Sequence, residues 1–158
     1  MRFFRILLIL GLVGSLTACD LFERRDRTFQ GDPKLEFFPL SATVDEGDVE
    51  AAPGDAVGLT TSIQLIGRQR DSELPITFTV ADSSTAVEGT HYTLPSTSAT
   101  LPADSSSVPV QVNVLDNSAD DGDESFVLFL NLQESNGVEP AENLRTFRLT
   151  LRGEDEGE

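Results

Sequence analysis

The sequence of 158 residues contains one cysteine, no tryptophan, one tyrosine and one histidine. A single cysteine excludes a disulfide within the chain, so packing alone must hold the core together. The lack of tryptophan leaves few aromatic platforms for stacking on sugar rings. The one histidine, His91, has no marked nucleophile and orienting acid around it, as a catalytic triad would require, and we expect a turn residue. The sequence also has no phosphate-binding glycine loop and no zinc-ligand spacing.

Basic residues are scarce as well, with 11 Lys and Arg against 27 Asp and Glu. Arg2 and Arg5 lie in an N-terminal segment without acids, so the chain from Cys19 onward carries nine basic residues and a formal net charge of −18. Such a surface repels phosphate backbones, and we therefore expect no nucleic-acid partner. It attracts cations, which leaves two interpretations open: the acids keep an exported domain soluble, or some of them bind calcium.

One apolar run close to the N-terminus, residues 6–16, is too short to span a bilayer comfortably. Arg2 and Arg5 precede it, as in a secretory signal peptide. The sequence Leu-Thr-Ala-Cys then ends at Cys19 and resembles a bacterial lipobox, in which the cysteine is lipidated and the chain is cut before it. We therefore predict a lipoprotein signal peptide over 1–18 and lipidation of Cys19. The alternative is an ordinary secretory signal with an incidental cysteine.

Residues 19–34 are expected to form a flexible tether that starts at the lipidated cysteine. The segment is charged and has no periodic pattern of apolar residues. Fully extended, it reaches roughly 50 Å at about 3.3 Å per residue. Acyl chains such as palmitate would anchor it stably, which predicts a protein of the bacterial cell envelope whose domain lies outside the cytoplasm. The sequence leaves open whether the anchor lies in the inner or the outer membrane, and which envelope protein is the partner.

Two segments with a period of two dominate the rest of the chain. Valine occupies every second position of 108–114, and apolar residues occupy every second position of 126–132. This alternation predicts half-buried strands whose apolar residues face one side. Pro109 lacks a backbone donor and faces outward, so its strand should lie near a sheet edge there.

Other short apolar runs also have strand patterns, with turns between them and no segment of helical period. About seven strands predict an all-β fold, a seven-stranded immunoglobulin-like antiparallel β-sandwich over residues 35–152, followed by an acidic tail at 153–158. The phenylalanines in these strands, Phe38 among them, are expected in the core. The expected strands cover residues 35–44 with a break at Pro39, 57–66, 75–80, 92–101 with a break at Pro95, 108–114, 126–132 and 144–151.

The order of motifs in residues 41–132 resembles that of Calx-beta domains. A strand ends in Val-Asp-Glu at 44–46, like the family's Val-x-Glu element. An acidic turn at 81–86 and a Gly-Thr-His-Tyr element at 89–92 follow, like the family's acidic turn and its Gly-x-Asp-Tyr element. The spacing then matches as far as Phe126. The chain is also similar to small β-sandwich lipoproteins of unknown function from Bacteroidota.

The resemblance implies a seven-stranded sandwich with a calcium site in acidic loops at one end. Carried over position by position, the implied ligands are Glu46, Asp82, Asp116, Asp121, Asp123 and Glu124. Where the family has further acids, this chain has Asn117, Ser118, Thr93 and Ser96. His91 also replaces the aspartate of the Gly-x-Asp-Tyr element. Calcium prefers six to eight oxygen ligands, so tight binding, weak millimolar binding and no binding all stay open.

These features predict a membrane-anchored, non-catalytic β-sandwich of the cell envelope with a role in binding, adhesion or structure. Ca2+ is the cofactor that the resemblance implies, and the lipid on Cys19 would make the contact with the membrane. Two alternatives are a subunit of a larger envelope lipoprotein assembly, joined by strand addition, and a carboxylate-dependent hydrolase. The acidic segment 116–124 is not an EF-hand, because its sixth position is Asp121 instead of glycine.

Overall fold

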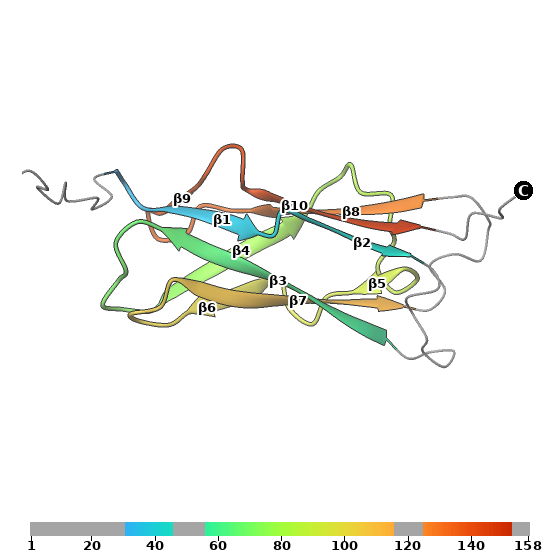
Figure 1. The fold of residues 1–158 in the computed structure, drawn as a ribbon, viewed down its shortest axis with the longest axis horizontal. Coiled ribbons are helices and arrows are strands. Elements are labelled where there is room, and N and C mark those ends of the chain that lie inside the picture. The colour runs from blue at the N-terminus through green and yellow to red at the C-terminus, as the bar shows by residue number, and fades with distance from the viewer. Residues whose placement is uncertain (1–30, 46–55, 116–124, 153–158) are drawn as a thin grey trace, which may run out of the picture.

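A computed structural model of the chain describes residues 31–45, 56–115 and 125–152, which form strands joined by turns (Figure 1). None of these residues is helical, so the described part has no helix long and apolar enough to cross a bilayer. The strands are β1 (Lys34–Phe38), β2 (Ser41–Asp45), β3 (Ala56–Ile66), β4 (Leu74–Val80), β5 (Tyr92–Thr93), β6 (Ser98–Leu101), β7 (Ser107–Leu115), β8 (Ser125–Leu132), β9 (Glu139–Pro140) and β10 (Thr146–Arg152).

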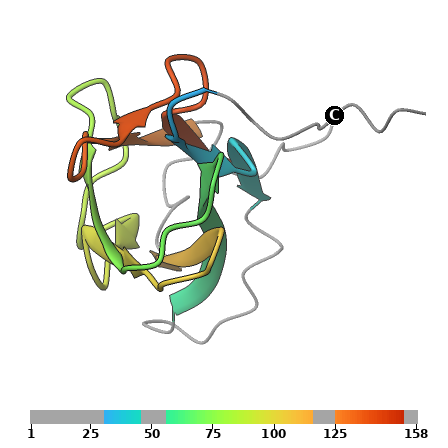
Figure 2. The same cartoon turned by 90° about the vertical axis from the view of Figure 1, so that its left-hand side faces the viewer.

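The strands form two five-stranded sheets that face each other across one apolar core (Figure 2). The first sheet has the order β5-β7-β3-β1-β9, and the second has the order β2-β10-β8-β4-β6. The predicted all-β architecture of two packed sheets is therefore confirmed.

The described residues contain ten strands, whereas the sequence predicted seven. The predicted break at Pro39 separates β1 from β2, which count as two strands because the chain crosses there from the first sheet to the second. Proline has no N–H group with which to continue a ladder, so a strand break at this position is expected. Strand β9 has only two residues, too few to show a periodic pattern.

Two of the strand pairs are parallel, which corrects the prediction of an antiparallel sandwich. Strand β1 pairs with β9 in parallel, and β2 pairs with β10 in parallel, while the other pairs are antiparallel. The chain keeps its direction when it crosses at Pro39, so β2 enters the second sheet in the same direction as β10.

The apolar faces of β7 and β8 point into the core, as the sequence predicted. Val112 and Val114 of β7 are fully buried, and so are Leu128 and Leu130 of β8. Gln111, directly before Val112, is exposed, and Asn113, between the two valines, is half-buried. Burying one such apolar side chain stabilises the fold by about 1.5–3 kcal/mol. The two strands come from different sheets, so their apolar faces meet in the middle of the sandwich.

A cluster of three phenylalanines links the sheets. The ring of Phe37 in the first sheet lies 6.3 Å from that of Phe78 and 5.9 Å from that of Phe147, both in the second sheet. Phe38, by contrast, is 61% exposed, so its predicted place in the core was wrong. Successive residues of a strand point to opposite faces, and Phe37 takes the inner one.

Pro109 lies at an open edge, as predicted. Strand β3 flanks Pro109 on one side, but β5 pairs with β7 only at Val114 and Asn113, so among the described residues the other side of β7 has no strand beside Pro109. The missing N–H group of proline removes one donor from this edge and thereby hinders the addition of a foreign strand.

Candidate metal-binding end

Strands of both sheets end or begin at one end of the domain, which we call the acidic end (Figure 1). In the first sheet, β3 begins at Ala56 beside Leu115, the last residue of β7. In the second sheet, Asp45, Arg152 and Ser125 lie side by side where β2, β10 and β8 end or begin. The acidic end is therefore built from five strand ends, two from the first sheet and three from the second.

Three acidic segments leave the described strands at this end. Segment 46–55 follows β2, segment 116–124 follows β7, and segment 153–158 follows β10. Together they contain 13 Asp and Glu and no Lys or Arg. Five of the six predicted ligands belong to these segments and lie outside the described residues: Glu46, Asp116, Asp121, Asp123 and Glu124. Their coordination stays a prediction, although the strand ends next to them are placed together.

Asp82 is the one predicted ligand among the described residues, and it lies exposed in the turn after β4. This turn runs along β8 and is fixed to it by side chains. The Ser84 and Thr85 hydroxyls accept hydrogen bonds from the backbone N–H groups of Phe129 and Val127, at 3.0 and 2.9 Å. The turn that carries Asp82 is therefore fixed to β8 at Val127 and Phe129.

His91 joins the two sheets at the acidic end, a role that the sequence did not predict. Its ring stacks on Phe126 of β8, with centroids 3.9 Å apart and planes inclined by 26°. Its backbone carbonyl accepts a hydrogen bond from the N–H of Leu115 at 3.1 Å. Leu115 directly precedes the acidic segment 116–124, and Phe126 lies just beyond it. His91 thus contacts the chain on both sides of this segment.

A tight loop fixes the imidazole of His91. The N–H of Val87 donates to its Nδ1 at 2.8 Å, and the N–H of His91 donates to the carbonyl of Val87 at 2.9 Å. Gly89 between them has a φ of 84°, a conformation that favours glycine. A ring nitrogen that accepts a hydrogen bond carries no proton, so the imidazole is neutral in this geometry. Burial acts in the same direction and lowers the pKa of His91 below its ordinary value of 6.5.

We predict that His91 makes the stability of the domain depend on pH below about 6.5. Its folded pKa lies below its unfolded pKa, so the unfolded state takes up the proton first as the pH falls. The free energy of unfolding contributed by the neutral ring is complete above pH 6.5 and is lost toward the folded pKa. Urea unfolding at pH 7.0 and 5.5 measures this loss. A His91→Gln variant keeps an acceptor without this titration, and an equal loss in both proteins would contradict the prediction.

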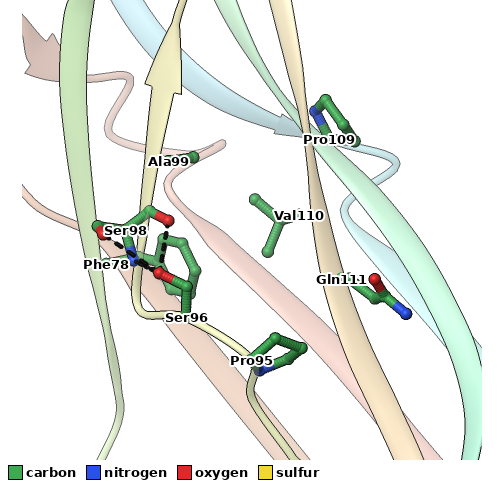
Figure 3. A pocket seen from close by; sticks show the side chains of 8 residues that line it. All are labelled: Phe78, Pro95, Ser96, Ser98, Ala99, Pro109, Val110 and Gln111. Atoms are coloured by element: carbon green, nitrogen blue, oxygen red, sulfur yellow. Dashed lines mark hydrogen bonds between the residues drawn. The ribbon is translucent and has the colours of Figure 1, made fainter.

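Two positions where Calx-beta domains have acids are placed by the structure. Thr93 lies in β5 beside Asn113. Ser96 lines a hollow of about 120 Å3 at the seam between β6 and β7, opposite Gln111 (Figure 3). Its hydroxyl donates to the carbonyl of Ser98 at 2.8 Å and accepts from the N–H of the same residue at 3.0 Å. Gln111 is four positions along β7 from the acidic end, about 13 Å away at about 3.3 Å per residue, so Ser96 does not belong to that end.

The described residues alone do not make a metal site or a catalytic triad. Within 31–45, 56–115 and 125–152, no three His, Cys, Asp or Glu side chains gather closely enough to hold a metal ion. His91 and Ser96 form no hydrogen bond with each other: Nδ1 of His91 accepts from the N–H of Val87, and the Ser96 hydroxyl donates to the carbonyl of Ser98. A calcium site at the acidic end would therefore need carboxylates from the three acidic segments.

Comparisons with models of protein families and with curated protein sequences found no match. The fold, however, matches solved structures. The apo form of the Calx CBD1 domain superposes with a TM-score of 0.61 at 17% identity, covering 79% of this chain and 100% of that one. The chain has the fold of a Calx-beta domain.

Two further structures have this Calx-beta-like fold in part of their chains. The calcium binding domain CBD12 of CALX1.1 gives a TM-score of 0.57 at 17% identity, covering 77% of this chain and 45% of that one. A candidate carbohydrate-binding protein from Bacteroides ovatus gives 0.59 at 13% identity, covering 75% of this chain and 36% of that one. This chain thus spans less than half the length of either protein. The likeness confirms the Calx-beta-like fold predicted from the motifs, and at such low identities it shows the fold alone.

Proposed function

We propose that this chain is a lipid-anchored, non-catalytic domain of the bacterial cell envelope whose acidic end binds Ca2+ at millimolar concentrations. The observation that carries the proposal is the meeting of strand ends from both sheets where three acidic segments leave the domain. The Calx-beta-like fold supports a binding role, since one solved structure with this fold is a calcium binding domain.

The oxygen atoms available at the acidic end suit a hard cation. Ca2+ binds six to eight oxygen atoms, often from several carboxylates. Segments 46–55 and 116–124 supply carboxylates without any basic residue, and Asp82 adds one from a turn fixed to β8. Without a cation these carboxylates repel one another. Asn117 and Ser118 offer only neutral oxygens, which favours a Kd in the range of about 10⁻⁴–10⁻³ M over a tighter one.

Isothermal titration of the chain from residue 19 onward with CaCl2 tests the assignment of the site. The wild-type protein should give a saturable signal, and Asp116→Asn and Asp82→Asn should each weaken binding by removing one negative charge. Glu142→Gln is the matched control, because Glu142 is exposed in the turn before β10, at the other end of that strand. Saturable binding with the same affinity in the wild type and in both aspartate variants would refute the site at the acidic end.

The anchor depends on Cys19, and its replacement gives an all-or-none prediction. Cys19→Ser removes the only thiol that an acyl transfer could use, so the protein should leave the membrane fraction or accumulate with its signal segment uncut. Cell fractionation and labelling with a clickable fatty acid measure both effects. Fatty-acid label that persists in the Cys19→Ser protein would contradict lipidation at this residue.

A subunit role in a larger envelope assembly is the second candidate function, and the edge of the second sheet favours it. Strand β2, Ser41–Asp45, has only β10 as a neighbour among the described strands and contains no proline. Its outer edge can therefore accept a strand from a partner. The third alternative, a hydrolase, gains no such support.

A further inference from the structure

Four strands lie outermost in the two sheets, and they differ in how well they can pair with a further strand. Strands β5 and β9 have two residues each, and β6 has four. The outer edge of β6 is also occupied at Ser98, because the hydroxyl of Ser96 accepts from the N–H of Ser98 and donates to its carbonyl. Strand β2, with five residues, is the longest of the four, and Figure 2 shows it (teal) at the margin of the domain.

The backbone groups on the free edge of β2 follow from its pairing with β10. Ser41 lies beside Arg148 in this parallel pair, and the N–H of Arg148 donates to the carbonyl of Leu40 at 2.8 Å. In a parallel ladder only alternate residues of a strand bond to one neighbour, so the residues at even positions of β2 bond to β10. The N–H and C=O groups that face away from β10 are those of Ser41, Thr43 and Asp45.

We infer that β2 pairs antiparallel with β2 of a second copy of this chain, about a two-fold axis at Thr43. Such pairing rests on the free edge proposed above for a subunit role, and it names the partner. Thr43 then lies opposite Thr43 of the second copy, and Ser41 lies opposite Asp45 of the second copy. The free groups of the two strands face each other in three pairs, and each pair exchanges two hydrogen bonds, about six in all.

The exposed charges on the outer face of β2 and β10 suit this pairing. Arg152 lies 3.9 Å from Asp45 at one end of β2. Arg148, beside Ser41 at the other end, has no ion-pair partner among the described residues. In the pair, Asp45 of the second copy lies two strands away from Arg148, about 10 Å between backbones, with only the small side chain of Ser41 between them. Each Asp45 is thereby placed between two arginines, one from each copy.

The antiparallel direction also keeps like charges apart. The two Asp45 side chains of the pair are separated by four positions, about 13 Å along the strands. A parallel pair in register would instead place them next to each other, where like charges destabilise a sheet. The antiparallel pair joins the second sheets of both copies into one sheet with five strands from each. Two five-residue edges form a contact below the about 1,000 Å2 of a stable interface, and we therefore expect a weak dimer.

Single cysteines test the register by disulfide cross-linking. The chain from residue 19 onward carries Cys19→Ser, so an introduced cysteine is the only thiol, and EDTA excludes Ca2+. In the pair the two Cα atoms at Thr43 lie about 5.5 Å apart, a separation that a disulfide spans. Thr43→Cys oxidised with diamide should therefore form covalent dimers at least about tenfold faster than Ser72→Cys, an exposed position in the turn before β4 that measures random collision.

Ser41→Cys and Asp45→Cys test which residues face each other. Either variant alone places its two thiols about 13 Å apart along the strands, too far for a disulfide, so it should cross-link no faster than Ser72→Cys. An equimolar mixture of the two should cross-link, because Ser41 of one copy lies opposite Asp45 of the other. Thr43→Cys at the rate of Ser72→Cys, or Ser41→Cys alone cross-linking as fast as the mixture, would overturn the inference.

Thr43→Pro tests the backbone hydrogen bonds without adding a thiol. Proline removes the N–H at the two-fold axis but none that bonds to β10, whereas Thr43→Ala keeps it. Sedimentation equilibrium in EDTA should show association weakened at least about tenfold by Thr43→Pro, which loses two hydrogen bonds, and little changed by Thr43→Ala. A wild-type chain that stays monomeric up to about 1 mM, or equal association of both variants, would overturn the inference and leave the edge to a foreign strand. These proteins carry neither lipid nor Ca2+, so failure here is distinct from failure of the anchor or the calcium site.

Discussion

Replacing Leu128 by alanine is expected to lower the free energy of unfolding by about 2–5 kcal/mol. Leu128 is fully buried in β8, which lies between β10 and β4 in the middle of the second sheet. The substitution removes apolar surface from the core and leaves a cavity, because strands on both sides prevent the sheet from collapsing around it. Urea unfolding, compared at the midpoint and with an unchanged m-value, measures the loss.

A matched pair of valines provides the control for this prediction. Val112→Ala and Val87→Ala delete the same two methyl groups, but Val112 is fully buried and Val87 is 54% exposed. Val112→Ala should cost about 1.5 kcal/mol or more, at about 0.8 kcal/mol for each buried carbon, and Val87→Ala should cost little. Equal costs for the two valines would contradict the assignment of faces on which the packed sandwich rests.

The central strands could be predicted from the sequence because their signal is local. In 108–114 a valine stands at every second position, as expected for a strand with one face against a core and the other toward water, and in 126–132 every second position is likewise apolar, although Val127 and Phe129 between them are apolar too. These segments became β7 and β8 with the predicted faces inward. The edge position of Pro109 was also predicted correctly, because proline has no backbone N–H to donate to a neighbouring strand.

The strand count and the position of Phe38 could not be predicted, because they depend on partners distant in sequence. Which sheet β1 and β2 join is decided by pairing with β3 and β10, and the apolar pattern of 35–44 does not encode that choice. The two-residue strand β9 is defined only by its pairing with the edge of β1. Phe38 follows Phe37 directly, and the composition does not indicate which of the two side chains faces solvent.

The candidate site was predicted in part. The sequence identified the acidic segments, and the structure shows that the strands next to them end together. The ligand set carried over from the family stays a prediction for the five residues outside the described part of the chain. His91 was read as a turn residue, because its stacking on Phe126 joins positions 35 residues apart. The sequence feature that could have indicated this role is His91 itself, an aromatic ring at the position where the Gly-x-Asp-Tyr element has an acid.

Calcium is expected to raise the melting temperature of the chain from residue 19 onward by about 5–10 °C, on the basis of about 4 °C for each kcal/mol in a domain of this size. A ligand that binds only the folded state adds RT ln(1 + [L]/Kd) to the free energy of unfolding. With 10 mM Ca2+ and a Kd between about 0.1 and 1 mM, this term is about 1.4–2.7 kcal/mol. The cation also relieves repulsion among the carboxylates of the acidic end.

Thermal melting with and without Ca2+ tests the central claim most directly, namely that the acidic end is a calcium site. The account predicts a rise in 10 mM CaCl2, no comparable rise in NaCl of equal ionic strength, and loss of the difference in Asp116→Asn, while Glu142→Gln responds as the wild type does. NaCl controls for screening, which any acidic surface would show. An equal response to both salts, or a calcium response that Asp116→Asn leaves intact, would contradict the claim.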